Sequence, residues 1–230
     1  MVNNTKPCLT ATGLSKRVPL ESDELTILNG LDLQVAAGES VAITGVSGSG
    51  KSTLLGLLAG LDVPTTGTIE LLGRNLSQLN EDQRAALRLG QVGFVFQSFH
   101  LIPHFTALEN VRLPLELDKQ QQSIQQRAIQ ALQQVGLGQR LQHLPGQLSG
   151  GEQQRVALAR AFVYPVKILF ADEPTGNLDQ QTAQRMMELL FALQQQHNTA
   201  LVLVTHDPAL AQRCQTHYQL RDQKLYANPD

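Results

Sequence analysis

This sequence has few cysteines, a small net charge and no long apolar run. The two cysteines, Cys8 and Cys214, lie far apart and match no metal-binding spacing, so we expect reduced thiols in a cytosolic protein. A formal net charge of −2 gives no electrostatic footprint for nucleic acid. No apolar run approaches the ~18 residues of a membrane span, and the N-terminus lacks the apolar region of a signal peptide. These absences predict a soluble, intracellular protein that can still dock on a membrane protein.

What the chain does contain is typical of an α/β fold. Hydrophobic residues make up 42% of its 230 residues, enough to bury the core of one domain, with or without an inserted subdomain. Several short apolar runs rich in β-branched residues have the character of strands buried on both faces of a parallel sheet. These runs are SVAIT (40–44), VGFVF (92–96), KILFA (167–171) and ALVLVT (200–205). Residues 8–35 predict a small antiparallel sheet, and residues 218–227 predict a closing hairpin.

The β pattern disappears between Gln97 and about Pro145. Within this span, residues 121–137 place apolar side chains on one helical stripe. These are Ile124, Ala128, Leu132 and Val135. The many glutamines could also indicate a low-complexity tract. The regular apolar spacing and the closing Gly136 favour an amphipathic helix, and the chain is therefore expected to carry a mostly helical insert.

The strongest motif is GVSGSGKS, which matches the phosphate-binding pattern G-x-x-x-x-G-K-[ST] in full and lies between a predicted strand and a helical run, 53–61. Its glycines let backbone N–H groups curl around a phosphate. Lys51 would reach the β- and γ-phosphates of a nucleotide, and the Ser52 hydroxyl would hold Mg²⁺. A chance glycine-rich turn would not explain the ordered strand, loop, lysine and helix. The expected ATP-binding residues are Gly45, Val46, Ser47, Gly48, Ser49, Gly50, Lys51, Ser52 and Thr53.

Two acids follow the apolar run in KILFADEP. Asp172, at the strand end, is placed to support Mg²⁺. Glu173 could orient or deprotonate the water that attacks a γ-phosphate. A strand that ends in Asp-Glu is commonplace by itself, but downstream of a P-loop it indicates nucleotide hydrolysis. Pro174 and Gly176 then turn the chain into NLDQQT.

A second phosphate site is predicted in LSGGEQQR, residues 148–155. Ser149 and Glu152 have the spacing of a capping box ahead of a helical run. An ordinary capped helix accounts for these two residues, but Gly150 and Gly151 would only weaken it. The glycines make sense where a phosphate approaches the backbone at a helix N-terminus. Because the P-loop already cradles its own nucleotide, we expect this site to serve a nucleotide held by another subunit.

LSGGEQQR between a P-loop and a DEP strand resembles the signature of ATP-binding cassette (ABC) proteins, and the resemblance covers nearly the whole chain. With the patterns above, it implies an α/β fold: a P-loop NTPase core with a mainly parallel sheet, an N-terminal antiparallel β subdomain and a helical insert. The implied organisation is a single nucleotide-binding domain over 1–230. Its core comprises 1–97 and 146–230, and its helical subdomain 98–145. In that family two copies pair head to tail, and each signature closes on the ATP of the other copy.

The resemblance also implies roles for residues outside these motifs. Gln97 corresponds to the family glutamine that senses Mg²⁺ and water and links to the transporter, and Asp179 to an aspartate that couples the two sites of the dimer. His206 resembles the histidine that contacts the γ-phosphate, although a lone histidine at a strand end is usually structural. The implied catalytic residues are Glu173, His206, Gln97 and Lys51. Those that bind the partner's ATP are Ser149, Gly150, Gly151, Glu152 and Asp179, and those that hold magnesium are Ser52, Gln97 and Asp172.

One position departs from the family pattern. Many members carry an aromatic residue that stacks on adenine, and the alignment of LSKRV puts Val18 there. Because stacking on a base is worth ~1–3 kcal/mol, we expect looser ATP binding and poorer discrimination against GTP than in an aromatic-bearing relative.

The segment FVFQSFHLIPHFTALENVRLPLEL resembles the branch of lipoprotein-release and macrolide-efflux ATPases, and the chain is most similar to the YbbA group within it. This implies an ATPase on the cytoplasmic face of the inner membrane that uses ATP and Mg²⁺. It would pair with a second copy of itself and drive a permease with a large periplasmic domain, acting on a lipid-like or hydrophobic substrate, without nucleic acid. Phe99, Leu101 and Phe105 would form the cleft for the permease's coupling helix or, equally, part of the core.

Two alternatives share every catalytic motif: a soluble ABC ATPase that serves an assembly scaffold, and the ATPase of a solute importer. The TALENV segment and the lack of a nearby cysteine cluster argue against the scaffold, while the importer stays open. The span 97–145 is too short for the coiled coil of a chromosome-structure member, and a translation factor would have two cassettes. A kinase or GTPase would leave LSGGEQQR unexplained.

Overall fold

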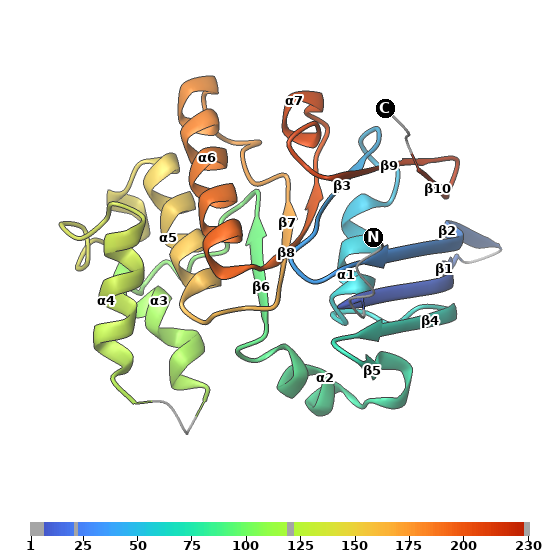
Figure 1. Ribbon diagram of the computed structural model, residues 1–230, viewed down its shortest axis with the longest axis horizontal. Helices are drawn as coiled ribbons and strands as arrows, with labels where there is room; N and C mark the ends of the chain where they lie inside the picture. The colour runs from blue at the N-terminus through green and yellow to red at the C-terminus, as the bar shows by residue number, and fades with distance from the viewer. Residues whose placement is uncertain (1–6, 21–22, 119–121, 228–230) are drawn as a thin grey trace, which may run out of the picture. The chain divides into compact units, whose positions relative to one another are not determined.

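The computed structural model describes residues 7–20, 23–118 and 122–227. By its internal contacts the chain divides into two compact units, whose elements are labelled in Figure 1. Unit 1 comprises Met1–Arg88 and Ala200–Asp230, and unit 2 comprises Leu89–Thr199. The helical subdomain over 98–145 that the sequence suggests stays a prediction.

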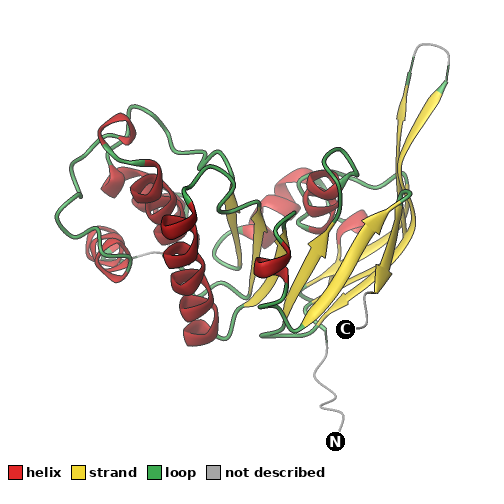
Figure 2. Ribbon diagram, turned by 90° about the horizontal axis from the view of Figure 1, so that it is seen from above, coloured by secondary structure: helices red, strands yellow, loops and turns green. Residues whose placement is uncertain are grey.

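Unit 1 contains the antiparallel sheet that residues 8–35 predict. Its strand order is β2-β1-β4-β5. These strands are β1 Leu9–Pro19, β2 Glu24–Val35, β4 Thr66–Leu71 and β5 Arg74–Asn75. The sheet is larger than expected, because residues 66–75 add two strands. Pairing with β4 stops at Ser15, whereas pairing with β2 continues to Pro19, so the outer parts of β1 and β2 form a narrow ribbon (Figure 2).

A second group of strands in unit 1 is mainly parallel. β3 (Ser40–Thr44) pairs in parallel with β8 (Ala200–Val204) and with β9 (Thr216–Arg221), and β9 forms the expected closing hairpin with β10 (Lys224–Ala227). All five residues of β8 are buried. Such burial on both faces explains why these strands read as continuous apolar runs in the sequence.

Four short helices complete the described part of unit 1. They are α1 Lys51–Leu58, η1 Leu76–Gln78, α2 Glu81–Arg88 and α7 Pro208–Ala211. Helix α1 begins at Lys51, two residues before the predicted helical run, and buries Leu54, Leu55, Leu57 and Leu58. It ends where Gly60 adopts a φ of +68°, a conformation that favours glycine.

Unit 2 combines a parallel strand pair with a helical cluster. β6 (Val92–Phe96) pairs in parallel with β7 (Ile168–Asp172), and Phe96 lies opposite Asp172 at the end of the ladder. The helices are α3 Ala107–Glu116, α4 Ile124–Gln134, η2 Pro145–Gln147, α5 Gly150–Phe162 and α6 Gln180–His197. Helix α5 packs against α3, α4 and α6 and against β6 (Figure 1). It is therefore the central helix of this unit.

The amphipathic helix expected over 121–137 is present as α4. Ala128 and Leu132 are fully buried, Ile124 is half-buried, and Gly136 adopts a φ of +75° just beyond the helix. The α/β fold class is thus confirmed, with antiparallel strands near the N-terminus, parallel pairs and a helical insert. None of the helices in the described part of the chain combines the length and apolar character needed to cross a membrane.

Candidate functional site

The predicted P-loop connects β3 to α1 in unit 1. At Gly45 a Cβ atom would lie 2.6 Å from the carbonyl oxygen of Leu220, so only glycine fits. Gly50 has a φ of +98° and directly precedes the helix. These glycines let the backbone turn tightly into the N-terminus of α1, which is an anion-binding arrangement. The Nζ of Lys51 donates to the carbonyl oxygens of Gly45 (2.8 Å) and Val46 (3.0 Å), so the ammonium group is held over the loop.

Ser49 supplies an independent sign that this loop accommodates a polar ligand. Among the described residues, its buried hydroxyl has no hydrogen-bond partner. A buried, unsatisfied hydroxyl costs about 1–3 kcal/mol. A phosphate oxygen in the loop would satisfy it, so the residues present fit a nucleotide.

His206 lies at the same sheet edge as the P-loop. It follows β8, which pairs in parallel with β3, and it is exposed. The carboxyl ends of neighbouring parallel strands are where α/β proteins bind ligands. Unit 1 therefore places Lys51, Ser52 and His206 at one edge.

Unit 2 brings together the other expected catalytic residues. Gln97 directly follows β6, and Asp172 ends β7 opposite Phe96. Glu173 comes next, with a φ of +45° that is uncommon for a non-glycine residue. Carboxylate and amide oxygens at one strand edge suit Mg²⁺, which prefers oxygen ligands.

A hydrogen-bonded pair that the sequence does not suggest orients Gln97. The Nε2 of Gln97 donates to the Oδ1 of Asn177 (3.2 Å), and the Nδ2 of Asn177 donates to the backbone oxygen of Gln97 (2.9 Å). At Gly176 a Cβ atom would lie 2.8 Å from this Nε2. The turn after Glu173 therefore fixes the glutamine side chain.

The signature segment forms the expected capping box. The Oγ of Ser149 accepts a hydrogen bond from the backbone N–H of Glu152 (3.3 Å), and Glu152 accepts one from that of Ser149 (2.9 Å). Arg140 also donates to Glu152, at 3.0 Å. The hydrogen bond from the Ser149 backbone, followed by that from Arg140, lowers the pKa of Glu152 to about 2.

The two signature glycines differ in their surroundings. A Cβ atom at Gly151 would lie 2.5 Å from the Cγ2 of Thr182, so packing against α6 by itself requires glycine there. At Gly150 the nearest atom would be 3.7 Å away, an ordinary contact distance. Gly150 is thus the glycine whose presence packing does not explain, and its role in binding a ligand stays a prediction.

Asp179 lies at the N-terminus of the neighbouring helix. Its Oδ1 accepts a hydrogen bond from the backbone N–H of Thr182 (3.0 Å), and hydrogen bonds from Thr182 lower the pKa of Asp179. Because Thr182 also contacts Gly151, unit 2 brings the N-termini of α5 and α6 together. Two helix N-termini side by side favour an anion.

The residues after Gln97 form a constrained loop. Phe99 and His100 adopt φ values of +61° and +49°, and such conformations cost about 1–3 kcal/mol each for non-glycine residues. Arg160 of α5 donates to the backbone oxygens of Phe99 (2.8 Å) and His100 (2.6 Å). Burial lowers the pKa of this guanidinium group. The half-buried Leu101 and Phe105 follow, and their role as a cleft stays a prediction.

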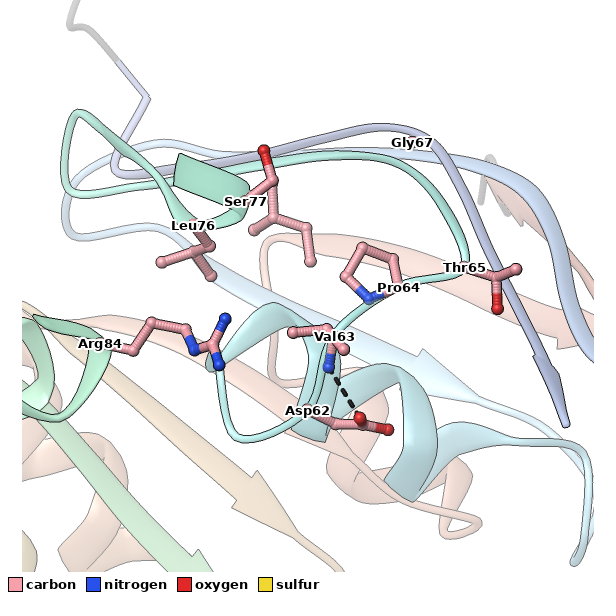
Figure 3. Close-up of a pocket in the computed structure, with 9 residues that line it drawn as sticks. Asp62, Val63, Pro64, Thr65, Gly67, Leu76, Ser77 and Arg84 are labelled. Atoms are coloured by element: carbon pink, nitrogen blue, oxygen red, sulfur yellow. Dashed lines mark hydrogen bonds between the residues drawn. The ribbon is translucent and has the colours of Figure 1, made fainter. Parts of the chain in front are cut away.

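A cavity of about 280 Å³ lies elsewhere in unit 1, near the end of α1 (Figure 3). Its charged groups are paired with protein partners: Asp62 binds Lys16 (2.7 Å), and Arg84 binds Glu81 (2.8 Å). None of the expected site residues lines it.

Val18, the position expected near adenine, is half-buried on β1 opposite Leu25.

Comparison with known proteins agrees with the presence of the P-loop, the strand-end acids and the signature segment. The sequence model of the family described as ABC transporter matches residues 28–176. The chain is 55% identical over 202 residues to the protein named uncharacterized ABC transporter ATP-binding protein YbbA of Escherichia coli (strain K12), covering 87% of this chain and 89% of the relative. It is 49% identical over 220 residues to the lipoprotein-releasing system ATP-binding protein LolD of Legionella pneumophila (strain Lens), with 95% and 97% covered.

Solved structures agree as well. The chain resembles the dimeric ATP-binding cassette MJ0796 in a post-hydrolysis state bound to ADP and Pi. The TM-score is 0.89 at 36% sequence identity, with 96% of this chain and 97% of that chain covered.

Proposed function

Because this chain belongs to the ABC transporter family and is an ATPase of the ATP-binding cassette type, we propose that two copies close head to tail on MgATP and drive a membrane permease with a large periplasmic domain. The observation that carries the proposal is the N-terminus of α5, where Ser149 forms a capping box and the surroundings of Gly150 leave the backbone open to a ligand. The dimeric state of the similar cassette bound to ADP and Pi supports it.

In each copy the P-loop would bind the phosphates of ATP. Backbone N–H groups of Gly45–Thr53 surround the site, the Ser49 hydroxyl gains a partner, and Lys51 turns from the loop carbonyls to the β- and γ-phosphates. Ser52, Gln97 and Asp172 would hold Mg²⁺, which supplies positive charge against the phosphate oxygens when bound.

Hydrolysis would depend on groups at the strand ends. The carboxylate of Glu173 orients the attacking water and accepts its proton. Lys51 and His206 stabilise the negative charge that develops on the phosphate oxygens. Gly150 and Gly151 of the other copy offer backbone N–H donors to the γ-phosphate. The Ser149 hydroxyl, which donates to Glu152 at 3.1 Å, would turn from this carboxylate to the phosphate, and Asp179 couples the two sites.

The names of the relatives support a permease partner. One of them is named as the ATP-binding protein of a lipoprotein-releasing system. We propose a similar role here, at the cytoplasmic face of the inner membrane, with the helical subdomain 98–145 contacting the permease and with a lipid-like or hydrophobic substrate.

The solution mass of Glu173→Gln, measured by light scattering with and without MgATP, tests the closed dimer. This variant keeps the phosphate contacts but lacks the proton acceptor, so we expect ATP to convert monomer to dimer. Lys51→Ala, which loses a phosphate contact, is the control that stays monomeric. If Glu173→Gln binds ATP and remains a monomer, the proposed ATP-driven dimer is wrong for the isolated protein.

A further inference from the structure

The loop 97–100 combines two unusual backbone conformations with a dedicated partner. In the described part of the chain, positive φ values occur at two consecutive non-glycine residues in two places. One pair, Asp222 and Gln223, forms the two-residue turn of the β9–β10 hairpin, where positive φ values at both positions are the usual geometry. The other pair, Phe99 and His100, lies in no hairpin, so its conformation has a different cause.

Arg160 contacts the backbone of both residues. Its two terminal nitrogens donate to the consecutive carbonyl oxygens of Phe99 and His100, at 2.8 and 2.6 Å. The planar guanidinium presents its donors as a rigid fork, which suits two adjacent acceptors better than a single ammonium group does. The left-handed turn aims both carbonyl groups at one side chain, and that side chain belongs to α5.

The same loop also reaches the other end of α5. A Cβ atom at Gly150 would lie 3.9 Å from the Cζ of Phe99, so the phenyl ring lies beside the N-terminus of the helix. The loop is therefore attached to α5 at two points: through its backbone at Arg160 and through a ring at Gly150. Gln97 lies at the start of this loop.

We propose that Arg160 is a positioning residue that holds the loop 97–100 in its left-handed conformation and thereby fixes Gln97 and Phe99 relative to Gly150. The proposal rests on the ATP-driven dimer proposed above and adds to it a link between the glutamine loop and the signature helix. In this role Arg160 acts on the backbone of the loop and not on the nucleotide. Its loss is expected to act through the loop alone.

Glycine substitution separates this role from a general contribution to folding. Glycine adopts positive φ values without steric cost, whereas alanine does not. His100→Gly and His100→Ala both remove the imidazole that stacks on Phe96 at 4.6 Å, but only glycine relieves the backbone. In an Arg160→Ala background, His100→Gly should therefore restore the loop and His100→Ala should not.

The experiment measures steady-state ATPase kinetics and backbone hydrogen exchange of residues 97–101. For Arg160→Ala we expect kcat to fall about tenfold or more, because small misplacements of positioning groups have such effects. The KM for ATP should change by less than about twofold, because the P-loop keeps its contacts. Backbone hydrogen exchange in the loop should accelerate. Adding His100→Gly should raise kcat again and slow the exchange. Arg127→Ala, which removes a hydrogen bond to the backbone oxygen of Val163 in the same unit, is the matched control and should leave the loop unchanged.

Unchanged exchange and kcat in Arg160→Ala would overturn the proposal, and so would equal rescue by His100→Ala. If Arg160→Ala does not fold, Arg160→Lys, which keeps the charge without the fork, undergoes the same glycine test. A Glu173→Gln variant that binds ATP and stays monomeric would count against the proposed function, while the kinetic and exchange measurements would still decide the role of Arg160.

Discussion

At the scale of single residues, backbone hydrogen bonds hold the charged and polar groups of the site. Lys51 rests on two loop carbonyls, Glu152 closes a capping box, and Asp179 caps α6. Each group is thus held in place by its own neighbours in the chain. The consequences of single substitutions can therefore be argued locally.

Glu152 gives a pH-dependent prediction. Its pKa is lowered from 4.5 to about 2, so ionised Glu152 stabilises the folded state above pH 4.5, and this stabilisation is lost as the pH falls toward 2. In Glu152→Gln the capping contact can persist, but the charge is absent. We expect the difference in Tm between wild type and Glu152→Gln to be largest above pH 5 and to shrink toward pH 2. A Tm difference that is constant over this range would contradict the lowered pKa of Glu152 in the folded state.

Val18 gives a prediction about nucleotide affinity. If its position lies beside adenine, Val18→Tyr adds a stacking contact worth ~1–3 kcal/mol, and the Kd for ATP should fall about tenfold. Titration calorimetry with ATP and with GTP measures both affinity and discrimination. Leu25→Tyr, opposite Val18 on β2, is a control for the added ring alone. An unchanged Kd in Val18→Tyr would show that this position does not contact the base.

At the scale of elements, α5 connects most of what unit 2 contributes. Its N-terminus carries the signature glycines against α6, its C-terminal half carries Arg160, and it packs on two helices of the insert. Contacts at both ends of this helix thus join the loop after β6 to the signature segment.

The adjacent signature glycines should respond differently to alanine. Gly151→Ala introduces a Cβ atom 2.5 Å from the Thr182 methyl group, and such overpacking should lower the free energy of unfolding by about 1–3 kcal/mol. Gly150→Ala meets only ordinary contacts, so its stability should be near wild type while ATP-dependent dimerisation is lost. Urea denaturation and light scattering measure the two effects.

The double variant Gly151→Ala with Thr182→Ser removes the clashing methyl group and should recover the stability that Gly151→Ala loses.

If Gly150→Ala and wild type dimerise equally on ATP, a phosphate contact at Gly150 is contradicted.

At the scale of the whole molecule, the expected catalytic residues divide between two compact units. Unit 1 carries the P-loop and His206, and unit 2 carries Gln97, the two acids and the signature. The proposed reaction draws on residues of both units and, in the proposed dimer, on the signature of the second copy.

The proposed partner is testable by purification. A tagged chain, extracted with detergent from membranes of cells that also express the candidate permease, is expected to retain a membrane protein with a large periplasmic domain. Lys51→Ala should retain it equally, because the P-loop is not part of the proposed contact. Recovery of an importer-type permease without a periplasmic domain would favour the solute-importer alternative.

The sequence by itself determined the features that depend on a few consecutive residues. The P-loop between strand and helix, the apolar strands β3, β6, β7 and β8, the amphipathic α4 and the capping box of α5 could all be predicted, because periodicity and capping act over one or two turns. The family follows from the same short motifs.

Tertiary structure alone decided the contacts between distant segments. Gln97 meets Asn177, Arg160 meets Phe99, and Gly151 meets Thr182, across 80, 61 and 31 positions of sequence. No local pattern encodes such pairs, because each depends on how separate elements pack. The reason for each signature glycine, packing at Gly151 and an open approach at Gly150, could be separated only once α6 was in place beside α5.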